Sequence, residues 1–217
     1  GWKEKMLSQA GKEVLLKSVA MAMPNYAMNC CKLPVGLCKD ICRDMAKFWW
    51  GSKEDEKRVH WMGWRKLTQV KGKGGLGFRD LHEFNKAMLA KQLWRIITKP
   101  SLLVSKVLRG KYFKGESIWK MKPRNSDSWM WRSVVSAREV LEGGARKRIG
   151  DGGTVHIWRD AWLSGGGHGR ITTARPPGGH TQMVKELIQN GEWNQTLVKG
   201  MYKESDCKRI LATPVSL

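Results

Sequence analysis

Four of the five cysteines lie between residues 30 and 42, and a cluster of thiols is the first feature of this chain that could bind a metal ion. The cluster comprises Cys30, Cys31, Cys38 and Cys42, with Cys207 far away in the sequence. It lacks the set of Cys-x2–4-Cys pairs that common structural zinc sites use. Cys38 and Cys42 lie one helical turn apart and can pack as small apolar side chains. We therefore predict no bound metal and free thiols in a reducing compartment.

A glycine-rich loop at residues 71–78 is the second candidate for chemistry, because such loops can cradle a phosphate. It lacks the Gly-Lys-Ser/Thr ending of a nucleotide-binding loop, and a flexible turn is the alternative interpretation. Asp151 stands between two glycines, where we favour a hairpin turn over a catalytic role. The five histidines show neither metal-ligand spacing nor an evident nucleophile partner.

The charge of the chain points to a polyanionic partner. The formal net charge is +21, from 40 basic and 19 acidic side chains. Residues 51–150 hold 24 of the basic and 9 of the acidic groups, so the excess lies in the middle of the chain. Nucleic acid is the commonest partner for such an excess, and an anionic membrane surface comes second. Most of the twelve tryptophans should be core residues, while a minority could stack on bases.

The apolar periodicity predicts a mainly α-helical fold with one small β-hairpin. In the first helix we expect Leu7, Ala10, Val14 and Met21 on one stripe and Lys12 on the opposite face. Leu16, Ala20 and Met23 lie near the lysine face, so this helix should contact neighbours on two sides. Predicted helices cover residues 6–23, 34–51, 80–98, 101–112 and 128–142, and two or three short ones lie within 181–213. Asp80 and Ser101 are the predicted N-caps of the third and fourth helices, and Trp131, Val134, Val135 and Leu141 should point inward in the fifth. The hairpin should pair residues 146–149 with 154–158. We expect these divisions: a helical region at 1–112, a helix-plus-hairpin module at 113–163, a Gly/Pro-rich linker at 164–180, and a short helical tail at 181–217.

Four stretches together resemble the region that follows the polymerase active site in plant LINE-type (non-LTR retrotransposon) reverse transcriptases. They are residues 5–19; 48–51 with 60–61; 74–81 continuing through 84–85 and 89–92 to 94–95; and 149–152 with 157–158, 160 and 162–163. The likeness covers residues 2–163 well and 181–217 loosely. Similar stand-alone fragments occur among plant nuclear and mitochondrial reading frames.

The resemblance implies a thumb-like helical bundle followed by a helical connecting region, and truncation before a zinc-binding segment. The parent activity would be RNA-directed DNA synthesis, with Mg²⁺ held by an adjacent Asp-Asp pair. None of the eight aspartates of this chain has an aspartate neighbour, and no acidic cluster of a ribonuclease H is evident. We therefore expect no catalysis, no cofactor and no small-molecule substrate. The expected partner is RNA or DNA template–primer, not a membrane, and the compartment is left open among nucleus, cytoplasm and mitochondrion.

Basic side chains on the thumb-like helix, the glycine-rich loop and the predicted hairpin are the candidate phosphate ligands. They are Lys3, Lys5, Lys12, Lys17, Lys71, Lys73, Arg79, Arg146, Lys147 and Arg148. Solvated faces are the alternative for the helix lysines and for the Arg146–Arg148 run.

Three interpretations stay open at this point: a piece of a retrotransposon polyprotein that binds template–primer, a stand-alone nucleic-acid-binding protein derived from such an element, and a decayed relic. The reading frame upstream of Gly1 distinguishes them.

Overall fold

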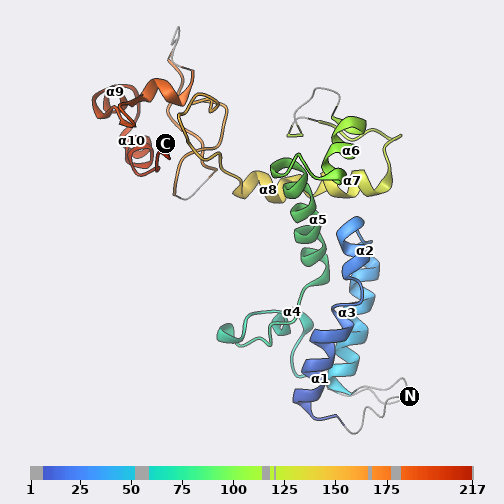
Figure 1. Ribbon diagram of the computed structural model, residues 1–217. Coiled ribbons are helices and arrows are strands. Elements are labelled where there is room, and N and C mark those ends of the chain that lie inside the picture. The colour runs from blue at the N-terminus through green and yellow to red at the C-terminus, as the bar shows by residue number, and fades with distance from the viewer. Residues whose placement is uncertain are drawn as a thin grey trace. The chain divides into compact units, whose positions relative to one another are not determined.

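The computed structural model describes residues 7–51, 59–113, 118–119, 121–165, 168–176 and 182–216, and Figure 1 shows the course of the chain. Two compact units are present, Gly1–Leu141 and Glu142–Leu217. The described residues form mostly helices and one two-stranded antiparallel sheet, which confirms the predicted fold class. Among these residues, no helix is both long enough and apolar enough to cross a membrane.

The first core of unit Gly1–Leu141 lies among the N-terminal helices. These are α1 (Gln9–Leu15), the π-helix η2 (Leu16–Ala20), α2 (Asn25–Cys30) and α3 (Val35–Trp50). The predicted stripe is wrong for Val14, which is 64% exposed, whereas Met21 is buried as predicted. Leu16, expected near the lysine face, is buried together with Lys12. In η2 the amide of Met21 donates to the carbonyl of Leu16, five residues earlier. This wider turn brings Leu16 and Met21 onto the same buried face.

Helix α3 begins and ends where local signals predict. Pro34 precedes its first turn, and Gly51 follows its last residue with φ +70°, the left-handed conformation that glycine adopts without strain. The Gly51 amide donates back to the Phe48 carbonyl, which satisfies one of the open carbonyls of the helix end. The buried face of α3 includes Met45 and Trp49.

Helix α5 (Leu81–Thr98) connects both cores of this unit (Figure 1). The Asp80 carboxylate accepts from the amides of His82 at 2.9 Å and Glu83 at 3.1 Å, so the predicted N-cap is confirmed. Leu81, at the start of α5, packs in the first core. Leu93, nearer its end, packs in the second core against α6 and α7. The long helix therefore fixes the two cores relative to each other.

The second core contains the helices that follow α5. They are α6 (Leu103–Tyr112), α7 (Trp129–Ser136) and the start of α8 (Arg138–Gly144). Two short helices, α4 (Trp64–Leu67) and the 3-10 helix η3 (Lys71–Lys73), precede α5 in the chain. Trp131 is fully buried, and the Tyr112 ring stacks on it with ring centres 4.6 Å apart. The single helix predicted at 128–142 is instead broken at Ala137. Leu102, rather than the predicted Ser101, occupies the N-cap of α6.

The C-terminal unit contains a hairpin, but not at the predicted place. Its elements are the 3-10 helix η4 (Val184–Leu187), β1 (Ile188–Gln189), β2 (Glu192–Trp193), α9 (Gln195–Met201) and α10 (Glu204–Leu211). The predicted pairing of 146–149 with 154–158 does not form, because distant segments take their backbone groups. Ile149 bridges to Val215, and the Val155 carbonyl accepts from the amide of Val184. The Asp151 carboxylate accepts from the Gly153 amide at 3.0 Å, which makes this segment a tight turn.

The predicted linker also differs from the structure. Asp206, buried on α10, accepts hydrogen bonds from the amides and hydroxyls of Thr172 and Thr173. Burial raises the pKa of the Asp206 carboxyl, but these hydrogen bonds outweigh it and hold the pKa below its ordinary value. The described residues 168–176 therefore pack within the C-terminal unit, and the unit boundary after Leu141 falls inside the predicted 113–163 module.

Candidate nucleic-acid interface

The first-helix lysines do not form the predicted row of phosphate ligands. Lys3 and Lys5 lie outside the described residues. Lys12 is 8% exposed, and its ammonium nitrogen lies 5.8 Å from the centre of the Phe48 ring. The face of α1 that carries Lys12 packs toward α3, so the prediction is wrong for this residue.

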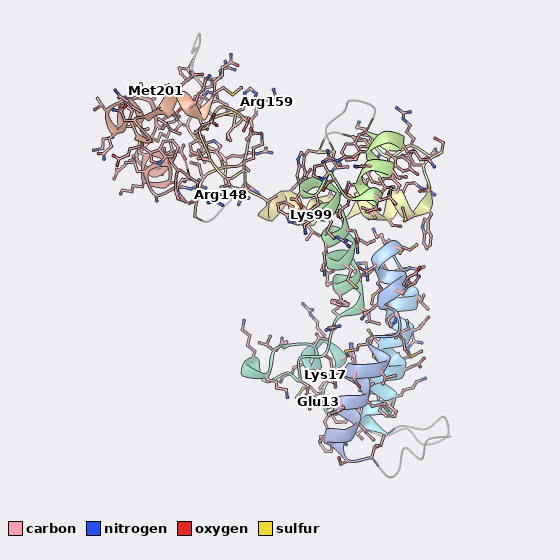
Figure 2. All side chains as sticks on the ribbon, in the orientation of Figure 1. Glu13, Lys17, Lys99, Arg148, Arg159 and Met201 are labelled. Atoms are coloured by element: carbon pink, nitrogen blue, oxygen red, sulfur yellow. The ribbon has the colours of Figure 1, made fainter. Side chains whose placement is uncertain are left out.

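Lys17 and Lys71 hold the glycine-rich loop against the first helix through Glu13. The Glu13 carboxylate lies 2.7 Å from the ammonium of Lys17 and 3.0 Å from that of Lys71, and Figure 2 shows Glu13 and Lys17 next to each other. Lys17 also donates to the Leu76 carbonyl at 2.6 Å. The hydrogen bonds from Lys17 and then Lys71 lower the pKa of the Glu13 carboxyl. Lys17 thus has a structural role, whereas Lys71 is still 68% exposed.

The glycine-rich loop forms a closed turn in which most backbone amides are already bonded. A phosphate cradle needs backbone amides that point at the ligand. Every amide from Lys73 to Phe78 already donates to a backbone carbonyl, including Leu76 to Leu67 and Gly77 to Gln69. At Gly75 a Cβ atom would collide with the Gln69 carbonyl, so this position requires glycine. The turn interpretation is therefore confirmed, and the amides from Lys73 to Phe78 are not available to a phosphate.

The remaining loop cations lie on the surface. The Arg79 guanidinium lies 4.4 Å from the centre of the Phe84 ring, a stacked arrangement that leaves it exposed. The side chain of Lys73 is exposed and makes no hydrogen bond or ion pair with another described residue. A role for these two in phosphate contact stays a prediction.

The three basic residues after α8 belong to no strand and are partly engaged. Arg146 donates to the Ala145 carbonyl at 3.0 Å, and Arg148 donates to the Ser216 hydroxyl at 2.9 Å. Lys147 lies 2.7 Å from the Asp160 carboxylate. Burial raises the pKa of the Asp160 carboxyl, but hydrogen bonds from Lys147 and a backbone amide outweigh it and lower the pKa. This run therefore contributes largely to the internal order of its own unit.

The structure assembles a basic groove that the sequence prediction missed. The α7 groove has a volume of about 440 Å³ and is lined by Lys32, Leu33, Pro34, Val35, Trp129, Arg132, Ser133 and Ser136. None of these residues is acidic. The side chains of Lys32 and Arg132 make no hydrogen bond or ion pair within the described ranges. Both cations are exposed and therefore available to an anionic ligand.

A smaller pocket borders the N-terminal end of α7. It has a volume of about 200 Å³, and its lining includes Lys111, Lys122 and Arg124. The Asp127 carboxylate in its wall accepts a hydrogen bond from the backbone amide of Arg124 at 2.8 Å. This bond does not involve the Arg124 guanidinium, and Arg124 is exposed. We call the five cations of the groove and the pocket the basic α7 surface: Lys32, Lys111, Lys122, Arg124 and Arg132. This surface is the candidate nucleic-acid interface.

Asn85 on α5 fixes one wall of the groove. Its side-chain oxygen accepts from the Leu33 amide at 2.8 Å, and its side-chain nitrogen donates to the carbonyls of Met28 at 2.8 Å and Cys31 at 3.0 Å. Asn85 is 1% exposed, so these bonds are shielded from water. They hold the connection between α2 and α3 in one conformation and thereby position Lys32.

The other wall of the groove, which α7 forms, could have been predicted from the sequence. Trp131 and Val135 were predicted to point inward, and both are buried. That assignment places Trp129, Arg132 and Ser136 together on the outer face, because they are three and seven residues apart on one helix. The contribution of Lys32, nearly 100 residues earlier, carried no such signal.

The described residues contain no group of three or more histidine, cysteine, aspartate or glutamate side chains that could hold a metal ion. Cys38 is buried in the first core, and burial raises the pKa of the Cys38 and Cys42 thiols. The two cysteines therefore behave as packed apolar side chains, while the metal content of the protein stays a prediction.

Comparison with known proteins identifies two Arabidopsis thaliana relatives. An uncharacterized mitochondrial protein is 44% identical over 144 residues, which cover 66% of this chain and 94% of that protein. A protein named "Putative ribonuclease H protein" is 36% identical over 169 residues, which cover 76% of this chain and 27% of that protein. No protein-family model matches the chain. No solved structure is similar to it at a significant level.

Proposed function

The chain belongs to the family of the Arabidopsis mitochondrial protein, and from this premise we propose that it is a non-catalytic, nucleic-acid-binding part of a LINE-type reverse transcriptase. It would bind template–primer through backbone phosphates. The second relative supports a retroelement origin, because ribonuclease H domains follow this region in such polyproteins. The matched region is about a quarter of that relative, so any activity of the longer protein is itself part of the proposal.

The basic α7 surface is the observation that carries this proposal. Lys32 and Arg132 line the α7 groove, and Lys111, Lys122 and Arg124 line the pocket at the N-terminal end of α7. Four of them, all except Lys111, make no polar side-chain contact in the described part of the chain. A group of unpaired cations is unfavourable by itself, because like charges repel, and a polyanion removes that repulsion. Phosphate contacts of this kind position a nucleic acid without reading its sequence.

Salt-dependent binding tests the proposal. If all five cations contact phosphates, log K should fall against log salt with a slope of about −3.5 on a single strand and −4.5 on a duplex. Replacing Lys122, Arg124 and Arg132 with alanine should weaken binding to every sequence alike and reduce the slope by about 2 to 3.

The matched control removes three exposed lysines from the C-terminal unit, Lys185, Lys199 and Lys203. It changes the net charge by the same amount. If both triple variants lose affinity and slope equally, the chain is a diffuse polycation and the localised interface is wrong. No binding of the unaltered protein at low salt would reject the function itself.

A stand-alone nucleic-acid-binding protein is the second candidate. The matched segment makes up 94% of the Arabidopsis mitochondrial protein, so a protein of about this extent exists as a separate chain. Sequencing the reading frame upstream of Gly1 separates the two candidates. An intact palm with an Asp-Asp pair supports the polyprotein, whereas a nearby start codon supports the separate protein.

A further inference from the structure

Trp129 is exposed on a helix whose other face, with Trp131, Val134 and Val135, is buried. Its side chain is 55% exposed at the first position of the helix, whereas Trp131, two residues later, is fully buried. In the described part of the chain, Trp129 contacts no other aromatic ring and donates no hydrogen bond. One face of a large indole therefore stays available at the wall of the α7 groove.

Two cations from different segments border this indole. Arg132 lies one helical turn after Trp129 on α7. Lys32 comes from the connection between α2 and α3, which the buried Asn85 side chain holds in place. The first turn of α3 follows directly, with neither an acidic residue nor a side-chain cap, and its N-terminal end adds further positive potential. The lining of the groove thus combines an aromatic surface with two cations and no acidic residue. Glu83 and Glu139 line an adjoining pocket that shares Lys32 and Ser136 with the groove.

We propose that the α7 groove holds one unpaired base of a single-stranded RNA or DNA segment, with Trp129 stacking on the base and Lys32 and Arg132 contacting its flanking phosphates. The inference deepens the proposed function and rests on it. Aromatic side chains beside a positive track are how proteins hold single strands without reading sequence. A duplex lacks the required free base face, because each of its bases is already stacked and paired.

A charged protein partner fits this groove less well. An acidic peptide would use the two cations, but it would leave the indole without a flat partner. A volume of about 440 Å³ lies within the range of small-molecule sites, roughly 300–1,000 Å³, which suits one planar base with its phosphate.

The test compares variants of the full chain on three labelled probes: a 12-nucleotide RNA, a 12-nucleotide DNA and a blunt DNA duplex. Trp129→Ala should weaken binding to both single strands roughly 10-fold or more and leave the duplex unchanged. Trp129→Phe keeps an aromatic face and should retain most of the affinity. Trp61→Ala is the matched control, since Trp61 is 83% exposed but lies outside the groove.

The results distinguish a failure of the proposed nucleic-acid binding from a failure of the proposed stacking by Trp129. If the unaltered protein binds none of the three probes, the proposed function is wrong and the groove has no nucleic acid to hold. If it binds them but Trp129→Ala and Trp61→Ala behave alike, the stacking role of Trp129 is wrong. Equal losses for Trp129→Ala on single strands and duplex, or equal losses for Trp129→Phe and Trp129→Ala, also overturn it. Circular dichroism confirms that each variant is folded, which Trp129 should permit because it belongs to no core cluster.

Discussion

Replacing Asn85 with alanine should both destabilise unit Gly1–Leu141 and release one wall of the α7 groove. The Asn85 side chain makes three hydrogen bonds of 2.8, 2.8 and 3.0 Å with backbone groups of the segment from Met28 to Leu33. The side chain is 1% exposed, so water cannot replace these bonds without local opening of the structure. Alanine would leave one amide and two carbonyls without their partner.

The expected loss follows from this count. Each buried hydrogen bond contributes about 1 kcal/mol net, and an orphaned buried group costs about 1–3 kcal/mol. Three bonds therefore amount to about 3 kcal/mol, a large part of the roughly 5–15 kcal/mol that stabilises a domain. Urea unfolding should show the midpoint of this unit lowered by about 1–3 M, given a denaturant dependence of roughly 1–3 kcal/mol per M.

Gln92→Ala is the control for this measurement. Gln92 donates one part-buried hydrogen bond to Asn29, 2.8 Å long, and accepts one exposed hydrogen bond from Arg95, 3.3 Å long, in the same region. Its removal should cost about 1 kcal/mol or less. If Asn85→Ala costs no more than Gln92→Ala, the buried amide does not hold the connection between α2 and α3. In that case the groove wall must be positioned by apolar packing alone.

Four further predictions follow from the structure and the sequence. Asp206→Asn should destabilise the C-terminal unit at pH 7. Because the folded pKa of Asp206 lies below the ordinary 3.8, the contribution of this carboxylate is present above roughly pH 5 and is lost as the pH falls through the folded pKa. Unfolding measured from pH 7 to 3 should show the difference from the unaltered protein shrinking. Gly75→Ala should cost about 2 kcal/mol or more, since a Cβ atom collides with the Gln69 carbonyl, whereas Gly72→Ala has open space and should be nearly neutral in thermal unfolding. The purified chain should extend no primer on an RNA template with Mg²⁺ or Mn²⁺, and extension that survives removal of contaminating polymerases would contradict this. Elemental analysis should find less than one zinc per chain, and one tightly held zinc lost on mutating the cysteines at 30–42 would show that prediction to be wrong.

Local signals in the sequence predicted the main helices well. Asp80 caps α5, and the helix ends at Thr98 as expected. Gly51 ends α3 in the left-handed conformation, which the sequence also indicates. The reason is that a cap or a terminating glycine acts on backbone groups only a few residues away, so its effect does not depend on the rest of the fold. The mainly helical fold class follows from such signals.

The hairpin shows the limit of local signals. The sequence offers two glycine-containing turns in its last third, and the hairpin forms at Asn190-Gly191, where both residues have positive φ. Asn-Gly is the stronger two-residue hairpin signal. The residues on either side of Asp151 instead form backbone hydrogen bonds and bridges with distant segments near Val184 and Val215. Competition between partners far apart in the sequence decided this outcome.

The sequence by itself determined the ends of α3 and α5, the basic composition and the lack of an adjacent aspartate pair, because each is a property of residues or of short segments. The tertiary structure alone decided which cations are available. Packing buried Lys12, and ion pairing tied Lys17 and Lys71 to Glu13. The same packing brought Lys32 beside α7, about 100 residues further along the chain. A charge acts on a partner according to its position in space and its exposure to solvent, and only the folded chain sets those two quantities.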